Sequence, residues 1–279
     1  MTRTIRLGIS PCPNDTFAFH GLITGAVDWR GLRFEVELLD IQQLNDRLLR
    51  GEFDVAKTSF HAALFLADDC VVLPSGSALG FGVGPLLLAA STAAAPSDAR
   101  QLTLLPGRHT TAALLFDLFH PGTTRIEHVV FSDIMPRLKG GHAEFGVCIH
   151  EGRFTWREQG LSLVEDLGTR WENETGCPLP LGGIVARRRL PAATIATVQE
   201  VIHDSLRLAL ADRDAALPTM RRHAQECDDR VLMQHVDLYV NEWTVYLGDT
   251  GARALGTLAA RAAVRGIGAR APLEIFSPS

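Results

Sequence analysis

Cysteine is scarce in this chain and is not grouped: five residues stand apart among 279, at Cys12, Cys70, Cys148, Cys177 and Cys227. An odd, scattered set argues against the paired framework of a disulfide-rich secreted domain. No CxxC pair and no cysteine–histidine cluster has the spacing of a metal site. We therefore expect reduced, mostly buried thiols in a cytoplasmic protein that binds no metal.

Long apolar runs are also missing. The segment around residues 86–90 is far shorter than the roughly 20 apolar residues that a membrane-spanning helix needs. The first residues lead directly into a predicted strand, Ile5–Ile9, without the apolar core or the cleavage site of a signal peptide. These absences predict neither export nor a membrane partner.

Charge of one sign is not in excess. The chain has 27 basic and 32 acidic side chains, a formal net charge of -5 and a pI of about 6.1, so there is no electrostatic reason to expect a nucleic-acid partner. Hydrophobic residues make up 46% and charged residues 21%, which is the balance of a globular protein. At 279 residues the chain exceeds the usual size of one core, so two lobes are predicted.

Several catalytic signatures are absent. The sequence has no GxSxG elbow, no GxxxxGK[ST] phosphate loop and no HExxH zinc motif, so the reaction classes that use them find no support. Glycines are dense between Gly76 and Gly84, but they do not follow the GxGxxG pattern between a first strand and its helix. A dinucleotide site is therefore not predicted.

Short apolar strands alternate with helical segments through the first two thirds of the chain, which is typical of α/β layering. The predicted strands are Ile5–Ile9, Leu32–Leu39, Phe53–Ala56, Cys70–Pro74, Pro85–Ala89, Leu102–Leu105, Ile126–Phe131 and Phe145–Ile149. The predicted helices are Phe17–Gly25, Ile41–Arg50, Ser59–Leu66, Thr110–Phe119, 134–139, an amphipathic helix with the apolar stripe Ile195, Val198, Ile202, Leu206 and Leu210, then Asp228–Leu247 and Ala252–Val264.

Two segments are predicted to cross between lobes, the Ala/Ser/Pro-rich stretch Ala90–Ala99 and the stretch Pro178–Ala186. They divide the chain into a discontinuous lobe, residues 1–90 with 186–279, and a second lobe, residues 91–185. A discontinuous lobe of this kind is characteristic of the periplasmic-binding-protein fold. In such a fold the ligand lies in a cleft between the lobes, at the carboxyl ends of strands.

Polar clusters follow several of the predicted strands, where such a cleft needs them. The turn Ser10–Thr16 has two prolines and three candidates for capping the next helix, Asn14, Asp15 and Thr16. The cluster Lys57–His61 offers hydroxyls to a substrate oxygen or to the helix that follows. Helix capping alone explains both clusters, so capping and ligand binding stay open as alternatives.

A third cluster, Pro106–Thr111, belongs to the predicted second lobe. Gly107 permits close approach of the backbone, while Thr110 and Thr111 place donors at the positive end of a helix, where a carboxylate or a polyol would fit. An ordinary N-cap at Thr110 explains the pattern equally well.

Two of the ten histidines, His109 and His150, are best placed for the cleft. His150 directly follows the last predicted strand of the second lobe and is expected to point toward the cleft. An imidazole can act as a base near neutral pH without large tuning. The structural alternative is a histidine that only satisfies its hydrogen bonds at a strand end.

Together and in this order, the clusters resemble the family of 1,4-dihydroxy-6-naphthoate synthases. The resemblance rests on SPCPNDT (10–16), DVAKTSFHA (54–62), SGSALGFGVGP (75–85), PGRHTT (106–111), HEGRFT (150–155) and PLPLGGIVAR (178–187). It covers most of residues 5–187 and continues more weakly to Val240 and Asn241. The departures are small: Trp156 stands where tyrosine is expected, and Ala56 and Thr58 vary inside the second motif.

The resemblance implies a two-lobed type II periplasmic-binding-protein-like fold that works as a lyase without a metal or an organic cofactor. Enzymes of this family convert cyclic dehypoxanthine futalosine to 1,4-dihydroxy-6-naphthoate and a dihydroxyacetone-type fragment, on the futalosine route to menaquinone. His150 matches the base proposed for the family. The candidate substrate-binding residues are Thr110, Thr111, Gly107, Asn14 and Ser59.

Two other functions stay open. A non-catalytic receptor for a small carboxylate shares the fold, although such receptors normally carry an export signal. Chorismate dehydratase shares both the fold and the pathway, although the SPCPNDT segment argues against it. The expected partner is a small-molecule carboxylate, and the sequence leaves the oligomeric state open, a homodimer included.

Overall fold

The computed structural model describes residues 2–91, 95–150, 152–224, 228–268 and 271–277. Its strands are β1 (Arg3–Ile9), β2 (Leu32–Leu38), β3 (Val55–Ser59), β4 (Cys70–Val72), β5 (Ala78–Gly80), β6 (Leu86–Ala89), β7 (Leu102–Leu105), β8 (Arg125–His128), β9 (Phe145–Cys148), β10 (Ser162–Asp166) and β11 (Leu179–Arg187). Its helices are α1 (Pro13–Ala18), α2 (His20–Thr24), α3 (Ile41–Leu49), α4 (Phe60–Ala63), α5 (Thr111–Phe119), α6 (Phe131–Lys139), α7 (Gly152–Thr155), α8 (Leu167–Thr175), α9 (Ala192–Ala211), the 3-10 turn η1 (Asp214–Ala216), α10 (Leu217–His223), α11 (Asp229–Tyr239), α12 (Glu242–Val245) and α13 (Gly248–Val264).

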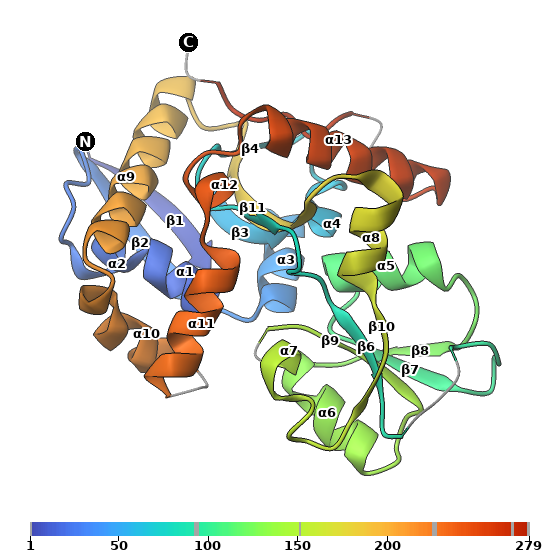
Figure 1. Ribbon diagram of the computed structural model, residues 1–279. Coiled ribbons are helices and arrows are strands. Elements are labelled where there is room, and N and C mark those ends of the chain that lie inside the picture. Colours follow the sequence, from blue (N-terminus) through green and yellow to red (C-terminus); the bar gives the residue numbers. More distant parts are fainter. Residues whose placement is uncertain (1, 92–94, 151, 225–227, 269–270, 278–279) are drawn as a thin grey trace.

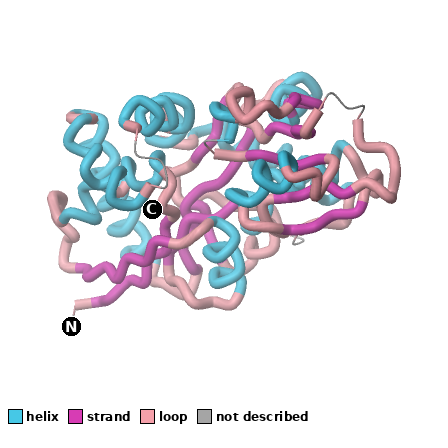
Figure 2. The backbone as a smooth tube through the Cα atoms, turned by 90° about the horizontal axis from the view of Figure 1, so that it is seen from below, coloured by secondary structure: helices cyan, strands magenta, loops and turns pink. Residues whose placement is uncertain are grey.

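Each of the two lobes is built around its own sheet. The first sheet has the strand order β2-β1-β3-β11-β4, with β5 also paired to β11, and the second has the order β10-β6-β9-β7-β8. In the first sheet β1 runs parallel to β2 and β3, whereas β11 is antiparallel to β3, β4 and β5. Figure 1 shows the second sheet, mostly in green, below and to the right of the first. The view from below shows the two sheets toward opposite ends of the molecule (Figure 2).

The chain passes between the sheets twice. It leaves the first sheet after β5 and enters the second at β6, then returns from β10 through α8 to β11. The passages lie at residues 81–85 and 167–178, whereas the sequence places the lobe boundaries at 90 and 186. The apolar runs of β6 and β11 could form strands in either sheet. Only the pairing of β6 with β9 and β10, and of β11 with β3, assigns each run to its sheet.

Two glycines hold the first passage against the start of α8. A Cβ atom at Gly84 would lie 2.1 Å from the Cα atom of Gly168, so the two backbones can approach this closely only as glycines. Asp166 caps α8 by accepting the N–H groups of Gly168 and Thr169, each at 3.0 Å. Arg153 donates to the carbonyl of Gly84 and, at 3.0 Å, to Asp166. The packing of Gly84 on Gly168 and the two Arg153 hydrogen bonds therefore fix the position of the chain just before β6.

The turn after β1 differs from its prediction. Helix α1 begins at Pro13, with Cys12 as the N-cap and no capping side chain. The expectation that residues 14–16 cap a helix beginning at Phe17 is therefore wrong. Proline already has the φ of a first helical residue and needs no acceptor for an N–H group, so the helix can begin earlier than the capping pattern indicates.

The C-terminal helices also depart from their predicted lengths. The predicted helix Asp228–Leu247 is divided into α11 and α12 at Asn241, whose side chain accepts the N–H of Trp243 at 3.0 Å and caps α12. Along α9 the predicted apolar stripe is buried except at its last member, Leu210, which is 40% exposed near the end of the helix. Strand β10 and helix α8 have no counterpart among the predicted elements.

Four of the five cysteines lie among the described residues and are free thiols: Cys12 is half-buried, and Cys70, Cys148 and Cys177 are buried. Cys227 and the motif residue Glu151 lie outside the described residues. Among the helices that the structure describes, none is both long and apolar enough to cross a membrane.

Candidate active site

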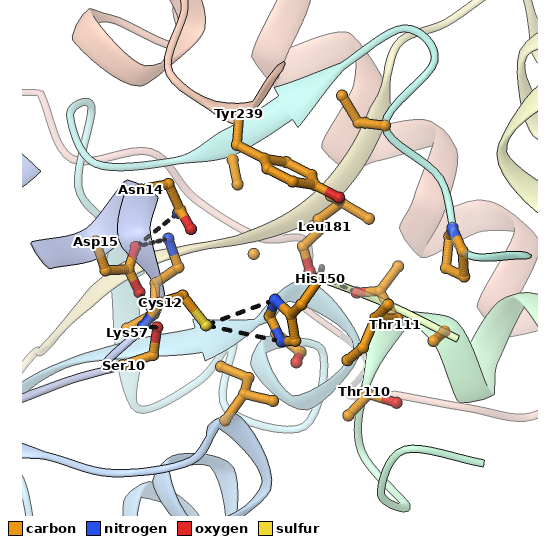
Figure 3. A pocket seen from close by; sticks show the side chains of 18 of the residues that line it. Ser10, Cys12, Asn14, Asp15, Lys57, Thr110, Thr111, His150, Leu181 and Tyr239 are labelled. Carbon is orange, nitrogen blue, oxygen red and sulfur yellow. Dashed lines mark hydrogen bonds and ion pairs between the residues drawn. The ribbon is translucent and has the colours of Figure 1, made fainter. Parts of the chain in front are cut away.

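A cleft lies between the two lobes and is lined by residues from both. Its empty volume, counted to the open mouth, is about 690 Å³. The first lobe contributes Ser10, Cys12, Asn14, Asp15, Ile41, Lys57, Ser59, Leu181, His235 and Tyr239 to the lining, and the second contributes Thr110, Thr111, Ala112, Ile149 and His150. Figure 3 shows most of these side chains converging on one space. The predicted site residues are all among them, except Gly107.

A buried ion pair forms one wall of the cleft (Figure 3). Lys57 Nζ lies 2.7 Å from Asp15 Oδ1, and the two side chains are only 6% and 4% exposed. Asp15 also accepts the Ser10 hydroxyl at 2.6 Å and the Asn14 amide at 3.0 Å, while Lys57 donates to the carbonyl of Gly76 at 3.2 Å. Buried charges persist in proteins when they are paired and hydrogen bonded. These bonds therefore connect α1, β3 and the loop after β4 to one another.

His150 lies across the cleft from this pair, just beyond β9. Its backbone φ is 55°, in the left-handed region that a histidine seldom adopts, so the backbone there is strained. The Cys12 thiol, from the first lobe, lies 3.5 Å from Nδ1 and 3.8 Å from Nε2. The ring of Phe131 packs edge-on at 4.8 Å between centroids. Contacts from both lobes therefore hold the imidazole in the cleft.

Two aromatic side chains of α11 complete this side of the cleft. His235 and Tyr239 are 2% and 6% exposed, and their ring centroids lie 4.5 Å apart. The His235 ring is nearly parallel to that of His150, at 20° and with 6.2 Å between centroids. Burial, helped by the neighbouring His150 and Lys57, lowers the pKa of His235 well below 6.5. His235 is therefore a neutral imidazole near pH 7.

Ser59 is positioned by Asn45, a buried residue of α3 that belongs to none of the predicted polar clusters. The Asn45 amide oxygen accepts the Ser59 N–H at 3.0 Å and the Thr58 hydroxyl at 2.9 Å. Its nitrogen donates to the Ser59 hydroxyl at 3.2 Å and to the carbonyl of His109, in the second lobe, at 3.3 Å. Ser59 makes no capping bond to α4, and its hydroxyl proton can be donated toward the cleft.

The N-terminus of α5 provides the opposite polar edge. Thr110 accepts the N–H of Ala113 at 3.2 Å and donates to the carbonyl of Gly107 at 3.0 Å, which confirms the predicted N-cap. The Thr111 hydroxyl donates to the carbonyl of Leu181, on β11, at 2.6 Å. Both hydroxyl protons are thus used within the protein. The donors that α5 can still offer an anion are the backbone N–H groups of its first turn.

The backbone at Gly107 lies close to the side chain of Gln42 and does not border the cleft. Its φ is 103°, and a Cβ atom there would lie 2.3 Å from Oε1 of Gln42. That oxygen also accepts the N–H of His109 at 3.3 Å. Neither Gly107 nor the side chain of His109 lines the cleft; His109 packs edge-on against Phe65, with 5.6 Å between centroids.

His61 supports the N-terminus of α5 from the first lobe. The side chain is 6% exposed, and its Nδ1 lies 3.0 Å from the carbonyl of Thr110. A carbonyl only accepts, so Nδ1 carries the proton. Burial lowers the pKa of His61 to about 4, with the bond to Thr110 opposing the shift.

The free energy of unfolding is expected to fall as the pH drops from about 6.5 to 4, in part because of His61. The unfolded chain, in which the pKa of histidine is about 6.5, takes up a proton before the folded chain does, so acid favours unfolding. With a folded pKa of about 4, this group alone contributes about 3 kcal/mol over that range. Urea denaturation at a series of pH values measures the effect.

His61→Asn keeps a donor near the Nδ1 position. In this variant the free energy of unfolding is expected to fall less steeply between pH 6.5 and pH 4, the acid limb of the series. The same substitution at the exposed His142 is the matched control and should leave the limb unchanged. His235 acts in the same direction as His61, so part of the acid sensitivity should remain. An equally steep limb in His61→Asn would show that His61 does not carry the effect.

No sequence pattern assigns Cys12, Lys57, His235 or Tyr239 to the site individually. Asp15 stood only within the cluster Ser10–Thr16, for which helix capping and ligand binding were alternatives. Lys57 gave a usable signal, because a lysine directly after the apolar strand Phe53–Ala56 is seldom buried without a partner. His235 and Tyr239 are four residues apart, the spacing of one helix face. No local pattern, however, pairs Lys57 with Asp15 or brings Cys12 to His150.

The chemistry that these groups support is proton transfer on an oriented organic anion. Four kinds of group converge on this cavity. They are the imidazole of His150, the neutral imidazole of His235, the hydroxyl of Ser59 and the first N–H groups of α5. Among the described residues, no group of three or more His, Cys, Asp and Glu side chains could hold a metal ion.

Relatives of known name match nearly the whole chain. A family model described as menaquinone biosynthesis matches residues 5–264. The 1,4-dihydroxy-6-naphthoate synthase of Thermus thermophilus is 43% identical over 272 residues, which cover 98% of each chain. The enzyme of the same name from Streptomyces coelicolor is 41% identical over 270 residues, 95% of this chain and 94% of the relative. Both names are those of enzymes, which implies that this chain is an enzyme as well.

Solved structures agree on the fold. A crystal structure of an Archaeoglobus fulgidus protein has a TM-score of 0.89 at 29% identity and covers 94% of this chain and 98% of that one. The periplasmic aliphatic sulphonate binding protein SsuA of Escherichia coli has a TM-score of 0.65 at 14% identity, over 100% of this chain and 94% of that one. This likeness confirms the predicted two-lobed, periplasmic-binding-protein-like α/β fold. With the family model matched over residues 5–264 and two relatives at 43% and 41% identity, the chain belongs to the menaquinone biosynthesis family.

Proposed function

We propose that this protein is a carbon–carbon lyase that converts cyclic dehypoxanthine futalosine to 1,4-dihydroxy-6-naphthoate and releases a dihydroxyacetone-type fragment. One observation carries the proposal: His150, which matches the family's base, is held between the lobes, with a buried polar wall on one side and a helix N-terminus on the other. The names and identities of the two bacterial relatives support the same reaction.

In the proposed reaction His150 accepts the proton of a substrate hydroxyl. The carbon–carbon bond beside that oxygen then breaks in retro-aldol fashion, and the ketone of the fused ring takes up the electron pair. Formation of the aromatic naphthoate drives the step. Such chemistry asks the protein for a base, for orientation of the substrate and for exclusion of water.

The carboxylate of the substrate is assigned to the N-terminus of α5. The N–H groups of Thr111 and Ala112, at the positive end of the helix, are available donors, because the Thr110 side chain takes the N–H of Ala113. Ser59 donates its hydroxyl proton to a substrate oxygen. Asn14 gives one amide N–H to Asp15 and offers its second N–H and its oxygen to the substrate.

Incubation with cyclic dehypoxanthine futalosine, followed by mass spectrometry, tests the proposal. The expected result is loss of the substrate mass and appearance of 1,4-dihydroxy-6-naphthoate in equal amount. Substrate that is bound tightly and recovered unchanged would instead favour a receptor. A parallel incubation with chorismate should leave chorismate unconverted, since its dehydration would identify the other enzyme of the pathway that shares this fold.

A further inference from the structure

His235 is a buried imidazole without a hydrogen-bond partner in the part of the chain that the structure describes. It is 2% exposed, and neither Nδ1 nor Nε2 has a partner there. Burying a polar atom in this way is destabilising, and nearly all buried polar groups in folded proteins have a partner. An imidazole kept in this state at a cavity wall indicates that a ligand supplies the missing hydrogen bonds.

The position of His235 supports a ligand contact, because the residue borders two neighbouring hollows. One is the cleft that contains His150, and the other is a mainly apolar hollow with an empty volume of about 680 Å³. The second hollow is lined in part by Pro13, Phe131 and Leu232, and the two hollows share Cys12, Ile41 and His235. A molecule that fills the cleft and extends toward the second hollow would therefore cross this shared boundary, to which His235 belongs.

Aromatic rings surround the His235 imidazole and fix its orientation. Tyr239 lies at 4.5 Å, His150 at 6.2 Å and Phe154, from the second lobe, at 6.5 Å between ring centroids. These ring contacts hold the imidazole in place without satisfying its nitrogens. A substrate atom that reacts at His150 is thus next to His235 as well.

The protonation state of His235 defines what it can bind. Burial, with His150 and Lys57 nearby, lowers its pKa well below 6.5, so the ring presents one donor and one acceptor nitrogen at neutral pH. A hydroxyl can both donate and accept, and a ketone oxygen accepts. The neutral ring therefore matches uncharged oxygens better than a carboxylate.

We propose that His235 binds a hydroxyl or ketone oxygen of the substrate, beside the bond at which His150 acts. The inference rests on the lyase function proposed above and adds a residue of the first lobe to the base contributed by the second. Its role is to orient the reacting part of the substrate, whereas the N-terminus of α5 holds the carboxylate.

His235→Phe tests this role, because phenylalanine keeps a flat ring near Tyr239 and removes both nitrogens. We expect kcat/KM to fall about 10- to 100-fold, since an oxygen of the bound substrate is left without its partner. The Tm should stay within about 2 °C of the wild type or rise, because an apolar ring replaces unsatisfied polar atoms. His235→Leu, a smaller apolar variant, should lose activity similarly and covers the case in which the larger ring does not fit.

Two amide variants separate contact from packing. His235→Asn places an amide near Nδ1 and His235→Gln near Nε2, so one of them is expected to recover at least about 3-fold of the lost kcat/KM. A purely structural role gives the opposite pattern: the Tm falls in the apolar variants while kcat/KM of the folded protein is unchanged. That pattern would overturn the proposal.

The wild-type protein distinguishes this inference from the lyase assignment. If the wild type and His235→Phe convert substrate equally well, the inference about His235 fails and the lyase stands. A second experiment measures the binding of 1,4-dihydroxy-6-naphthoate to both proteins by calorimetry. If the wild type binds the naphthoate but converts no substrate, the lyase fails, while weaker naphthoate binding by His235→Phe still supports the contact.

Discussion

Replacing His150 by asparagine is expected to lower kcat for cyclic dehypoxanthine futalosine about 10³-fold, while substrate binding stays within a few-fold of the wild type. General base catalysis by one side chain contributes about 10²- to 10⁴-fold, and asparagine cannot accept the proton. Asparagine is also suited to the backbone, because it tolerates the left-handed region that His150 occupies at φ 55°. Single-turnover and steady-state assays measure the two effects separately.

His109→Asn is the matched control for this experiment. His109 lies close to α5 but outside the cleft lining, packed against Phe65, so kcat should change less than about 2-fold. His150→Ala should also lose activity, but alanine at a positive φ adds a loss of stability that asparagine avoids. Turnover by His150→Asn at the wild-type rate would exclude His150 as the base.

Replacing Lys57 by methionine is expected to lower the free energy of unfolding by about 3–5 kcal/mol, measured by urea denaturation. The substitution keeps most of the apolar stem and removes the charge that Asp15 faces at 2.7 Å. Asp15 would then be a carboxylate, 4% exposed, without its counter-ion. The large effect comes from that uncompensated charge, since a buried pair taken as a whole stabilises a fold little.

A double-mutant cycle checks this explanation. Asp15→Asn leaves Lys57 without a counter-ion and should also destabilise the fold, whereas Lys57→Met with Asp15→Asn should lose less than the sum of the single losses. Arg137→Met is the control at an exposed pair, where Arg137 lies 2.6 Å from Glu127, and it should cost less than about 1 kcal/mol. If Lys57→Met and Arg137→Met lowered the free energy of unfolding equally, burial of the Lys57–Asp15 pair would not explain the effect.

Much of the fold could be predicted because its signals are local. In β1 the apolar side chains of Ile5, Leu7 and Ile9 recur at every second position and are fully buried, which is the period that indicates a strand. The cap at Thr110 is also local, since the side chain and the N–H that it accepts are three residues apart. The stretch Pro178–Ala186 was predicted as a crossing between the lobes, and most of it forms strand β11. It is a strand because it pairs with β3, β4 and β5.

The candidate site was predictable in outline for the same reason. His150, Thr110 and Ser59 stand at strand ends or helix starts, and the resemblance to a known family singles them out. The partners of these residues were not predictable. Asn45, which holds Ser59, belongs to another element, and Thr111 uses its hydroxyl on a carbonyl 70 residues away.

The order of the residues alone predicts the α/β class, the two lobes and the family, and the resemblance to that family points to His150 as the candidate base. The folding of distant segments establishes which groups meet: Lys57 with Asp15, 42 residues apart, and Cys12 with His150, 138 residues apart. It also places the neutral imidazole of His235 at the cleft wall, where it has no hydrogen-bond partner among the described residues. The reason is physical: helix and strand periods and caps depend on near neighbours in the chain, whereas burial and charge pairing depend on what packs around a group in space.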